Sequence, residues 1–245
     1  MPQSRFKEIY DAIREGIEDG SYPYQSLLPS ESDLCKRHDC SRSTVRRALS
    51  ELALDGYAQP IQGKGVRVIW RRETDEEIPY AMGGLESFDD VARRLRFEAR
   101  SEVRGFEELE VGERLARVTG FAVGERIWRI DRVRLANGTP ISIETSYLLQ
   151  AEAPGLTREA AGHSLYHYIE DVVGGSIATG KRTITVEAAT DDDLAVFGPL
   201  EPPAVGVMRG QHFDTNGVMF EYSEIRQHPS YFSVREVTTR PTPKG

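Results

Sequence analysis

The sequence predicts an α+β protein, with a small, mainly helical unit followed by a larger unit built on a mixed, mostly antiparallel sheet. Apolar residues recur at helical spacing in residues 5–54, whereas several segments beyond residue 127 alternate between apolar and polar residues as strands do. Residues 71–79 are polar, acidic and end in proline, which is typical of a linker. The 245-residue length suits one large domain or two modest ones. We expect domains at 1–72 and 84–245, with a linker at 73–83.

The composition indicates a globular protein without a membrane span. Hydrophobic residues make up 39% and charged residues 29% of the chain, and no apolar run approaches the length of a span. The N-terminus lacks the apolar core of a signal peptide, so we expect a cytoplasmic location. The two cysteines, Cys35 and Cys40, form no ligand cluster with histidine, and we expect no disulfide, metal or other cofactor.

The charge is divided unevenly along the chain. The formal net charge is −8, from 31 basic and 39 acidic residues. Residues 35–72 nevertheless hold nine basic residues and only three acidic ones. A compact basic patch on an acidic protein is typical of a surface that binds phosphate, although ordinary surface arginines give the same count. The pattern of residues within the patch must therefore decide between these interpretations.

Three helices are expected in the N-terminal unit. Apolar residues at helical spacing over 6–17 predict an amphipathic helix that ends near Gly20. Ser30 is placed to cap a second, short helix with Asp33 as the reciprocal acid, and Ser41 is placed to cap a third. The buried stripe of the third helix consists of Val45, Leu49 and Leu52.

The second and third helices are joined by a few residues, which indicates a helix-turn-helix with the third helix as the recognition helix. Arg42 and Arg46 stand four residues apart and therefore share one face of that helix. Arginine binds guanine or phosphate through two hydrogen bonds, and serine and threonine hydroxyls reach phosphate oxygens. Residues 57–62 and 66–69 then read as two short strands joined by a Gly-Lys-Gly tip, which makes a wing.

Several short stretches with fixed spacing span this unit. They are Leu28-Pro29-Ser30-Glu31, Ser41-Arg42-Ser43-Thr44-Val45-Arg46-Arg47-Ala48-Leu49, Leu52, Asp55-Gly56-Tyr57 and Gly63-Lys64-Gly65. Together they resemble the winged helix-turn-helix of the GntR family of transcription regulators, over essentially all of residues 5–69. The alternative is a winged helix that serves protein contacts alone.

The resemblance implies that this unit binds double-stranded operator DNA. The residues that it assigns to DNA binding are Ser32, Arg42, Ser43, Thr44, Arg46, Arg47, Lys64 and Gly65. At one of these positions, Ser32, many family members carry an arginine that touches DNA, so this chain departs from the family pattern there.

Beyond the linker, the sequence predicts a sheet with a few helices. Ser87 and Thr190 are placed to cap helices, and Asn137-Gly138 between two alternating segments is a strong hairpin signal. A further helix is expected over 165–173. The expected strands cover residues 127–135, 141–149, 182–188, 204–214, 219–227 and 232–239.

An arginine pair is the most informative feature of this second unit. Arg132 and Arg134 lie two residues apart on a predicted strand, so both side chains point to one face. On an otherwise apolar strand this pair suits an anionic ligand such as phosphate. Ion pairing across strands with Glu144 or Glu187 explains the pair equally well. The sequence contains no Gly-x-Ser-x-Gly, no Walker-type glycine loop and no metal-ligand spacing.

Four further stretches carry a second resemblance. They are Gly84-Leu85-x-Ser87-Phe88, Arg132-x-Arg134-x-x-Asn137-Gly138-x-Pro140-Ile141-x-x-Glu144, Ser164-Leu165-Tyr166-x-Tyr168-Ile169 and Phe220-Glu221-Tyr222-Ser223-Glu224. Over roughly residues 80–240 they resemble the UTRA effector domain, of chorismate-lyase-like fold, in the HutC branch of the same family. The resemblance implies a phosphate site made by Ser87, Phe88, Asp89, Arg132, Arg134, Ser164 and Tyr166. It implies a sugar site made by Glu144, Tyr147, Glu221 and Tyr222.

The wider pattern is most similar to that of trehalose operon repressors. This implies a repressor that trehalose 6-phosphate releases from DNA, and a homodimer, because one helix-turn-helix covers only half of a two-fold operator. The alternatives are a regulator of the same class that senses an amino-sugar phosphate or a small carboxylate such as urocanate. A lyase-like enzyme acting on an anionic substrate is a further alternative, which the attached winged helix disfavours.

Overall fold

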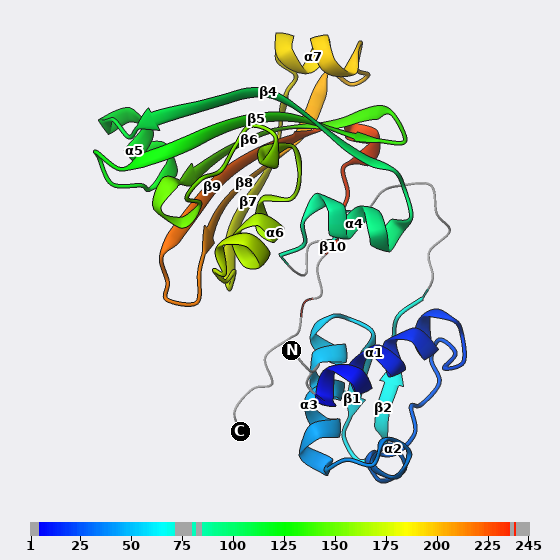
Figure 1. Cartoon of the computed structure of the whole chain (residues 1–245). Coiled ribbons are helices and arrows are strands. Elements are labelled where there is room, and N and C mark those ends of the chain that lie inside the picture. Colours follow the sequence, from blue (N-terminus) through cyan, green and yellow to red (C-terminus); the bar gives the residue numbers. More distant parts are fainter. Residues whose placement is uncertain (1–4, 72–79, 82–84, 236–237, 239–245) are drawn as a thin grey trace, which may run out of the picture. The chain divides into compact units, whose positions relative to one another are not determined.

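The structure is a computed structural model, and it describes residues 5–71, 80–81, 85–235 and 238. The chain folds into two compact units. One contains residues 5–71 and the other contains residues 80–235 (Figure 1). The predicted linker at 73–83 lies outside the described residues, except for the short strand β3 (Tyr80–Ala81). Each unit has buried apolar residues of its own.

The first unit combines three helices with a β-hairpin. The Ser30 hydroxyl accepts a hydrogen bond from the Asp33 amide, and the Ser41 hydroxyl accepts one from the Thr44 amide. These bonds satisfy amides that have no partner inside the helix, and they confirm both predicted caps. The elements are α1 (Arg5–Glu18), α2 (Glu31–His38), α3 (Arg42–Leu54), β1 (Ala58–Ile61) and β2 (Gly65–Val68).

One apolar core holds the first unit together. Each aliphatic side chain that becomes fully buried contributes about 1.5–3 kcal/mol, so this core determines which face of α3 turns inward. The polar face that carries Arg42 and Arg46 is left exposed. The buried members are Ile9, Ile13, Ile17, Leu28, Leu34, Val45, Ala48, Leu49, Leu52, Ala58 and Val68.

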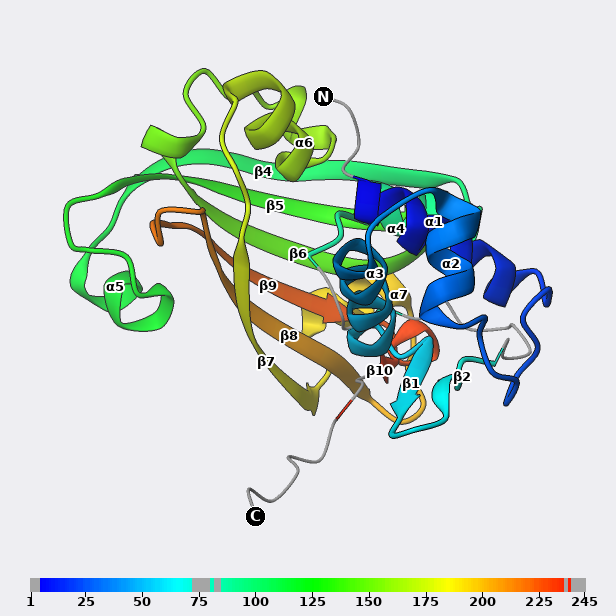
Figure 2. The ribbon, with the colours of Figure 1, turned by 90° about the horizontal axis from the view of Figure 1, so that it is seen from below.

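The second unit is built on a six-stranded antiparallel sheet with the order β4-β5-β6-β9-β8-β7, whose strands lie side by side in Figure 2. Asn137 and Gly138 join β5 to β6 with φ of 49° and 81°, the left-handed values that a two-residue hairpin needs, as predicted. The strands are β4 (Ala99–Glu110), β5 (Arg126–Ala136), β6 (Thr139–Leu149), β7 (Thr179–Ala188), β8 (Ala204–Phe213) and β9 (Met219–Gln227).

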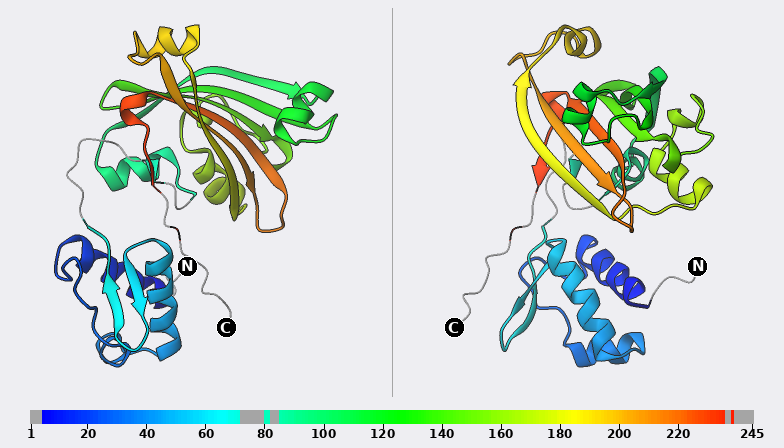
Figure 3. Two further views of the ribbon diagram at one scale, coloured as in Figure 1. Left: turned by 180° about the vertical axis from the view of Figure 1, so that it is seen from behind. Right: turned by 90° about the vertical axis from the view of Figure 1, so that its left-hand side faces the viewer.

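Helices cover both faces of this sheet (Figures 1 and 3). Leu165 of α6 packs with Ile130 and Leu148 on one face, whereas Leu115 of α5 packs with Ile127 on the other. Among the described residues, no helix is both long enough and apolar enough to cross a membrane. The helical elements are α4 (Phe88–Leu95), α5 (Glu113–Thr119), η1 (Gln150–Glu152), η2 (Ala160–Gly162), α6 (Leu165–His167), η3 (Tyr168–Val173), α7 (Asp191–Phe197) and η4 (Pro229–Tyr231).

Four elements differ from the prediction. Strand β4 and helix α5 were not expected, because β4 lies at the sheet edge and its charged residues obscure the apolar alternation. The helix expected over 165–173 is a single turn of α6 followed by the π-helix η3. Within the strand expected over 232–239, the described strand is the two-residue β10 (Val234–Arg235), which pairs in parallel with β3.

Candidate functional site

Helix α3, the predicted recognition helix, exposes several of the predicted DNA-binding side chains. The hydroxyl of its cap, Ser41, lies 2.8 Å from the hydroxyls of both Ser43 and Thr44. Arg42 is exposed, and its guanidinium donates to the Ser32 hydroxyl of α2 over 3.4 Å. The bond from Arg42 thus links the predicted residues at the start of α3 to Ser32 of α2.

Two further arginines of α3 have partners within the protein. Nε of Arg46 donates to both carboxylate oxygens of Glu31, at 3.0 and 2.9 Å, although 67% of the Arg46 side chain is exposed. Such an exposed ion pair is worth at most about 1 kcal/mol, so another anion can replace Glu31 at little cost. Arg47 instead lies over the ring of Phe6 in α1, with 3.8 Å between Cζ and the ring centre.

The wing tip is exposed. Lys64 lies between Gly63 and Gly65, whose φ values of 71° and 108° favour glycine, at the turn from β1 to β2. Because Ile61 pairs with Gly65, the hairpin closes immediately below the lysine. The Lys64 ammonium is therefore carried at the end of a tight hairpin.

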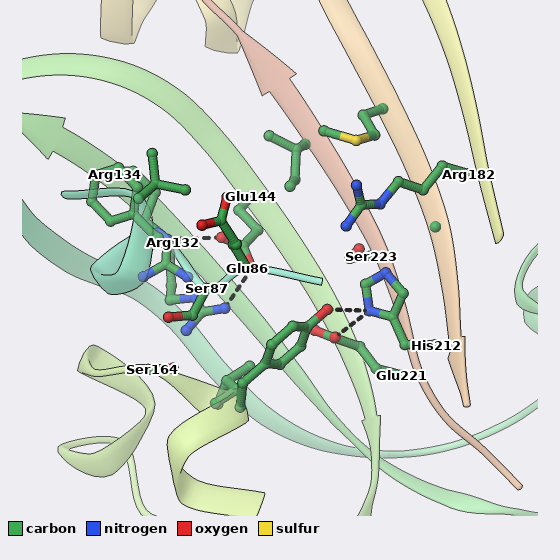
Figure 4. A pocket seen from close by; sticks show the side chains of 17 residues that line it. Glu86, Ser87, Arg132, Arg134, Glu144, Ser164, Arg182, His212, Glu221 and Ser223 are labelled. Atoms are coloured by element: carbon green, nitrogen blue, oxygen red, sulfur yellow. Dashed lines mark hydrogen bonds and ion pairs between the residues drawn. The ribbon is translucent and has the colours of Figure 1, made fainter. Parts of the chain in front are cut away.

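A pocket lies on the sheet face that α4 and α6 cover (Figure 4). The strand register places Ser223 of β9, Gly210 of β8 and Arg182 of β7 in one row across the sheet. Ser223 has a small side chain and Gly210 has none, which leaves space above this row. Of the predicted effector-binding residues, those that line the pocket are Ser87, Phe88, Arg132, Arg134, Glu144, Ser164, Tyr166 and Glu221.

Arg132 and Arg134 do point to the same face, and Glu144 lies between them. Nη2 of Arg132 donates to Oε1 of Glu144 at 2.5 Å, and Nε of Arg134 donates to Oε2 at 2.8 Å. Burial alone raises the pKa of the Glu144 carboxyl, but the two guanidinium charges outweigh it and hold the pKa far below its usual range. The structure thus agrees with two features expected of the arginine pair. The arginines line a pocket, as a ligand site requires, and they are also ion-paired with Glu144 across the strands.

The two arginines differ in what else they contact. Arg132 is 1% exposed, and its Nη1 donates to the carbonyls of Ala161 and His163 at 3.1 and 3.2 Å. Arg134 donates to the Ser101 hydroxyl at 2.6 Å and lies 5.3 Å from the centre of the Phe88 ring. Arg132 therefore anchors the loop before α6, whereas Arg134 connects β5 to β4 and to the start of α4.

Two helix caps form part of the pocket wall. The Ser87 hydroxyl accepts from the Asp90 amide, and the Ser87 backbone amide donates to the Asp90 carboxylate, which completes a capping box at the start of α4. The Ser164 hydroxyl accepts from the His167 amide at 3.2 Å. Both serines are buried, so their positions at the pocket are set by the helices that they cap.

A second polar cluster lies across the pocket from the arginines, as Figure 4 shows. Nδ1 of His212 lies 2.8 Å from the Tyr166 hydroxyl and 2.8 Å from Oε2 of Glu221. His212 and Glu221 are buried on neighbouring strands. A Cβ at Gly210 would lie 2.8 Å from Nε2 of His212, so glycine is needed for the ring to lie against β8.

Three predicted residues are not brought to the pocket. Tyr147 and Tyr222 pair with each other across β6 and β9, with 6.3 Å between ring centres, and pack near α5 on the opposite face of the sheet. Their assignment to the sugar end is corrected for this reason. Asp89 lies in the first turn of α4 and is not among the lining residues. Glu144 contacts the arginines, in the region predicted for phosphate.

Sequence reasoning missed Arg182 and His212, which also line the pocket. Their positions depend on how β7, β8 and β9 align, and this register is not visible in any single stretch of sequence. Glu187, proposed as an alternative partner of the arginine pair, instead bonds Arg209 and Arg226. Within the described ranges, no three His, Cys, Asp or Glu side chains are grouped to hold a metal ion.

Comparison with known protein families decides the class. Residues 6–68 match the family described as bacterial regulatory proteins, gntR family, and residues 94–233 match the UTRA domain. The chain belongs to the GntR family. Like other members, this GntR regulator combines a DNA-binding unit with a domain that senses a small-molecule effector, so it is a transcriptional regulator of the GntR/UTRA class.

Individual relatives agree with this assignment. The regulator is 32% identical to the HTH-type transcriptional regulator TreR of Bacillus subtilis (strain 168), over 95% of this chain and 96% of that protein. It is 31% identical to the mannosyl-D-glycerate transport/metabolism system repressor MngR of Escherichia coli (strain K12), over 89% of each chain. Both relatives are matched over nearly their whole length.

Solved structures share the fold of this GntR regulator. The crystal structure of YydK from Bacillus subtilis subsp. subtilis str. 168 matches with a TM-score of 0.77 at 22% identity, over 98% of this chain and all of that one. The effector-binding domain of the Bacillus subtilis trehalose repressor TreR matches with a TM-score of 0.51 at 25% identity, over 58% of this chain and 99% of that one.

Proposed function

We propose that this regulator is a repressor of trehalose utilisation and that trehalose 6-phosphate, bound in the pocket, releases it from its operator. The observation that carries the proposal is the buried pair Arg132 and Arg134 at one end of a pocket whose other end holds Glu221. Guanidinium groups suit a phosphate, and a carboxylate suits sugar hydroxyls. The similarity to TreR supports the choice of sugar.

On this proposal, the phosphate lies near Arg134, Ser164 and the start of α4. The first amides of a helix have no partner within it, and the helix dipole favours an anion there. The sugar lies over the Ser223 and Gly210 row, and the Tyr166 hydroxyl is within reach of its hydroxyls. The pocket then serves recognition, and the protein is not an enzyme.

The first unit is proposed to bind double-stranded operator DNA. Recognition of bases and phosphates is assigned to Arg42, Arg46 and the surrounding hydroxyls of Ser32, Ser43 and Thr44, and backbone contacts to the wing at Lys64 and Gly65. Arg47 is proposed to contact a DNA phosphate at the edge of this surface. DNA binding implies a location in the cytoplasm, where the chromosome lies.

A homodimer is part of the proposal, because a two-fold operator needs two recognition helices. The proposed boundaries are 1–72 for DNA binding, 73–83 for a linker and 84–245 for effector binding and dimerisation. The effector must bind the DNA-incompetent arrangement of the two heads more tightly than the competent one, since only such a difference shifts the equilibrium.

Calorimetry on the full chain tests the effector. We expect trehalose 6-phosphate to bind more tightly than glucose 6-phosphate and far more tightly than free trehalose. Equal affinity for trehalose with and without phosphate would remove the role of the arginines. Tighter binding of another sugar phosphate would support the pocket as the effector site but would show that the regulator senses a different sugar.

A second candidate effector is an amino-sugar phosphate. The Glu221 carboxylate lines the pocket and is only 3% exposed, so a ligand ammonium would find an opposite charge there. Glucosamine 6-phosphate belongs in the same calorimetric series for this reason. A small carboxylate such as urocanate is the remaining alternative. It should tolerate the loss of one arginine, whereas a phosphate should need both.

A further inference from the structure

Strand β7 forms one edge of the six-stranded sheet, next to β8 (Figure 2). Within the part of the chain that the structure describes, β8 is the only strand that pairs with it. The Ala189 amide donates to the Pro203 carbonyl, which continues the β7–β8 register by one position, so the odd-numbered residues of β7 bond β8. The backbone groups of the even-numbered residues therefore point away from β8.

The opposite edge of the sheet, β4, is protected against strand pairing. An irregularity interrupts its register between Val103 and Gly105, and Arg158 donates to the carbonyls of Val103 and Arg104 at 2.5 and 3.3 Å. Strand β7, in contrast, pairs with β8 over ten residues without a register shift. Its residues 183–186 are all β-branched, which favours an extended backbone. A long and regular edge of this kind is a template for pairing with another strand.

The sequence of β7 is complementary to itself in one antiparallel register. When an edge strand pairs with its own copy about a two-fold axis, opposed residues lie on the same face, so both are odd-numbered or both even-numbered. With the axis at Ile184, Lys181 lies opposite Glu187 of the second copy, and Thr183 lies opposite Thr185. Each of these pairs occurs twice, and both kinds are favourable across strands. Moving the axis by one residue in either direction removes the charge pair.

Glu187 belongs to a cluster with one excess negative charge. Its three carboxylates, Glu187, Glu224 and Asp193, share the two guanidinium groups of Arg209 and Arg226. The hydrogen bonds from Arg209 hold the pKa of Glu187 at about 2, so this carboxylate is ionised at neutral pH. Its side chain is 33% exposed, and an ammonium group from a second copy offsets the remaining charge.

We propose that β7 pairs with β7 of a second copy, antiparallel and centred on Ile184, and that this contact joins the effector domains of the dimer. The inference rests on the proposed function, because it takes the homodimer from it. The paired segments, residues 180–188, span about 30 Å. Arg182 lines the pocket and lies on this strand, so the pocket and the dimer contact share one element.

The direct test is Val186→Pro in the full chain. The Val186 side chain is 70% exposed and its amide points away from β8, so proline removes no bond of the sheet and is tolerated at such an edge. In the proposed dimer, the same amide bonds the backbone of Arg182 of the second copy. We expect the dimer dissociation constant, measured by sedimentation velocity over a range of concentrations, to rise at least about tenfold.

Val186→Ala is the matched control, because it removes the side chain but keeps the amide. It should dimerise like the unmodified protein, and urea unfolding should show the same effector-domain stability for both Val186 variants. Equal weakening of the dimer in the two variants would assign the effect to the side chain and would overturn backbone pairing.

Lys181→Glu tests the register and keeps the proposal testable if Val186→Pro does not fold. It places two pairs of like charges at the interface, so we expect about tenfold weaker dimerisation at low salt and a smaller effect at high salt. Arg100→Glu, the same charge reversal at an exposed position of β4, should leave dimerisation unchanged. Weakening by Val186→Pro without weakening by Lys181→Glu would overturn the register centred on Ile184.

The results distinguish this inference from the proposed function. If the unmodified chain is dimeric and neither Val186→Pro nor Lys181→Glu weakens the dimer, the pairing of β7 is wrong and the proposed homodimer stands. If the unmodified chain is monomeric at every concentration, the homodimer is wrong and the pairing falls with it.

Discussion

Two arginine pairs, one in each unit, carry similar chemistry at different depths. Arg42 and Arg46 lie on the exposed face of a helix, whereas Arg132 and Arg134 are 1% and 5% exposed on an interior strand of the sheet. In both places a glutamate pairs with arginine: Glu31 pairs with Arg46, and Glu144 pairs with both buried arginines.

The depth changes what the glutamate does. Water and salt weaken the exposed pair, so on the proposed function a DNA phosphate would replace Glu31 at a cost of about 1 kcal/mol or less. The buried carboxylate cannot turn to water, and its removal or its encounter with another anion is expensive. An exposed arginine pair is therefore suited to bind the phosphates of many DNA sites. A buried pair is suited to a single ligand that also donates hydrogen bonds to the carboxylate.

The largest difference should appear in stability. Arg132→Ala removes the partner of a buried carboxylate and the anchor of the loop at Ala161 and His163, so we expect a loss of about 3–5 kcal/mol in the effector domain. Arg46→Ala should change stability by less than about 0.5 kcal/mol, because its side chain is on the surface. Urea unfolding of both variants measures this contrast, and equal losses would contradict it.

The second prediction concerns the effector. Each charged hydrogen bond is worth roughly 1.5–3 kcal/mol, so Arg134→Ala should weaken trehalose 6-phosphate by at least about tenfold while operator binding without ligand persists. Arg126→Ala, on the same strand but exposed and paired with Glu108, is the control and should bind the ligand normally. Calorimetry decides between them. An unchanged affinity in Arg134→Ala would remove this arginine from the site.

The third prediction concerns operator DNA. Arg46→Ala should weaken binding to a palindromic operator by about 1–3 kcal/mol for each base or phosphate that the guanidinium binds. Lys64→Ala should weaken it less and reduce the salt dependence by about one unit per head, as expected for a phosphate contact. Lys7→Ala, which removes the same charge from the exposed side of α1, should leave binding unchanged. Anisotropy titrations at several salt concentrations measure all three variants.

The smallest effect is expected for Glu31→Gln. This change frees Arg46 from an exposed ion pair, so operator affinity should rise by less than about 1 kcal/mol. The corresponding change in the pocket, Glu144→Gln, should alter phosphate binding far more. A gain of several kcal/mol for Glu31→Gln would show that exposure does not distinguish the two pairs.

Local signals account for what the sequence predicted well. The caps at Ser30, Ser41, Ser87 and Thr190 and the Asn137-Gly138 turn all formed, because each depends on residues only a few positions apart. The arginine pair also follows from a local rule, since residues two apart on a strand share a face. These signals were enough to predict the three N-terminal helices and the wing.

Non-local strand alignment accounts for what was missed. Arg182 and His212 reach the pocket only through the register of β7, β8 and β9. The assignment of Tyr222 to the sugar site conflicts with a local rule, because Tyr222 is adjacent to Glu221 on one strand and the two side chains must point to opposite faces. The same rule separates Tyr147 from Glu144, three residues away on β6.

The release of DNA by the effector is the central claim, and one titration tests it most directly. The full chain is bound to a palindromic operator selected with this protein from random duplexes, and trehalose 6-phosphate, free trehalose and inorganic phosphate are added separately while fluorescence anisotropy is followed. We expect trehalose 6-phosphate alone to lower operator affinity, by about 5- to 150-fold for a typical coupling free energy of 1–3 kcal/mol. Operator affinity that stays the same with saturating trehalose 6-phosphate, or falls equally with inorganic phosphate, would contradict the claim.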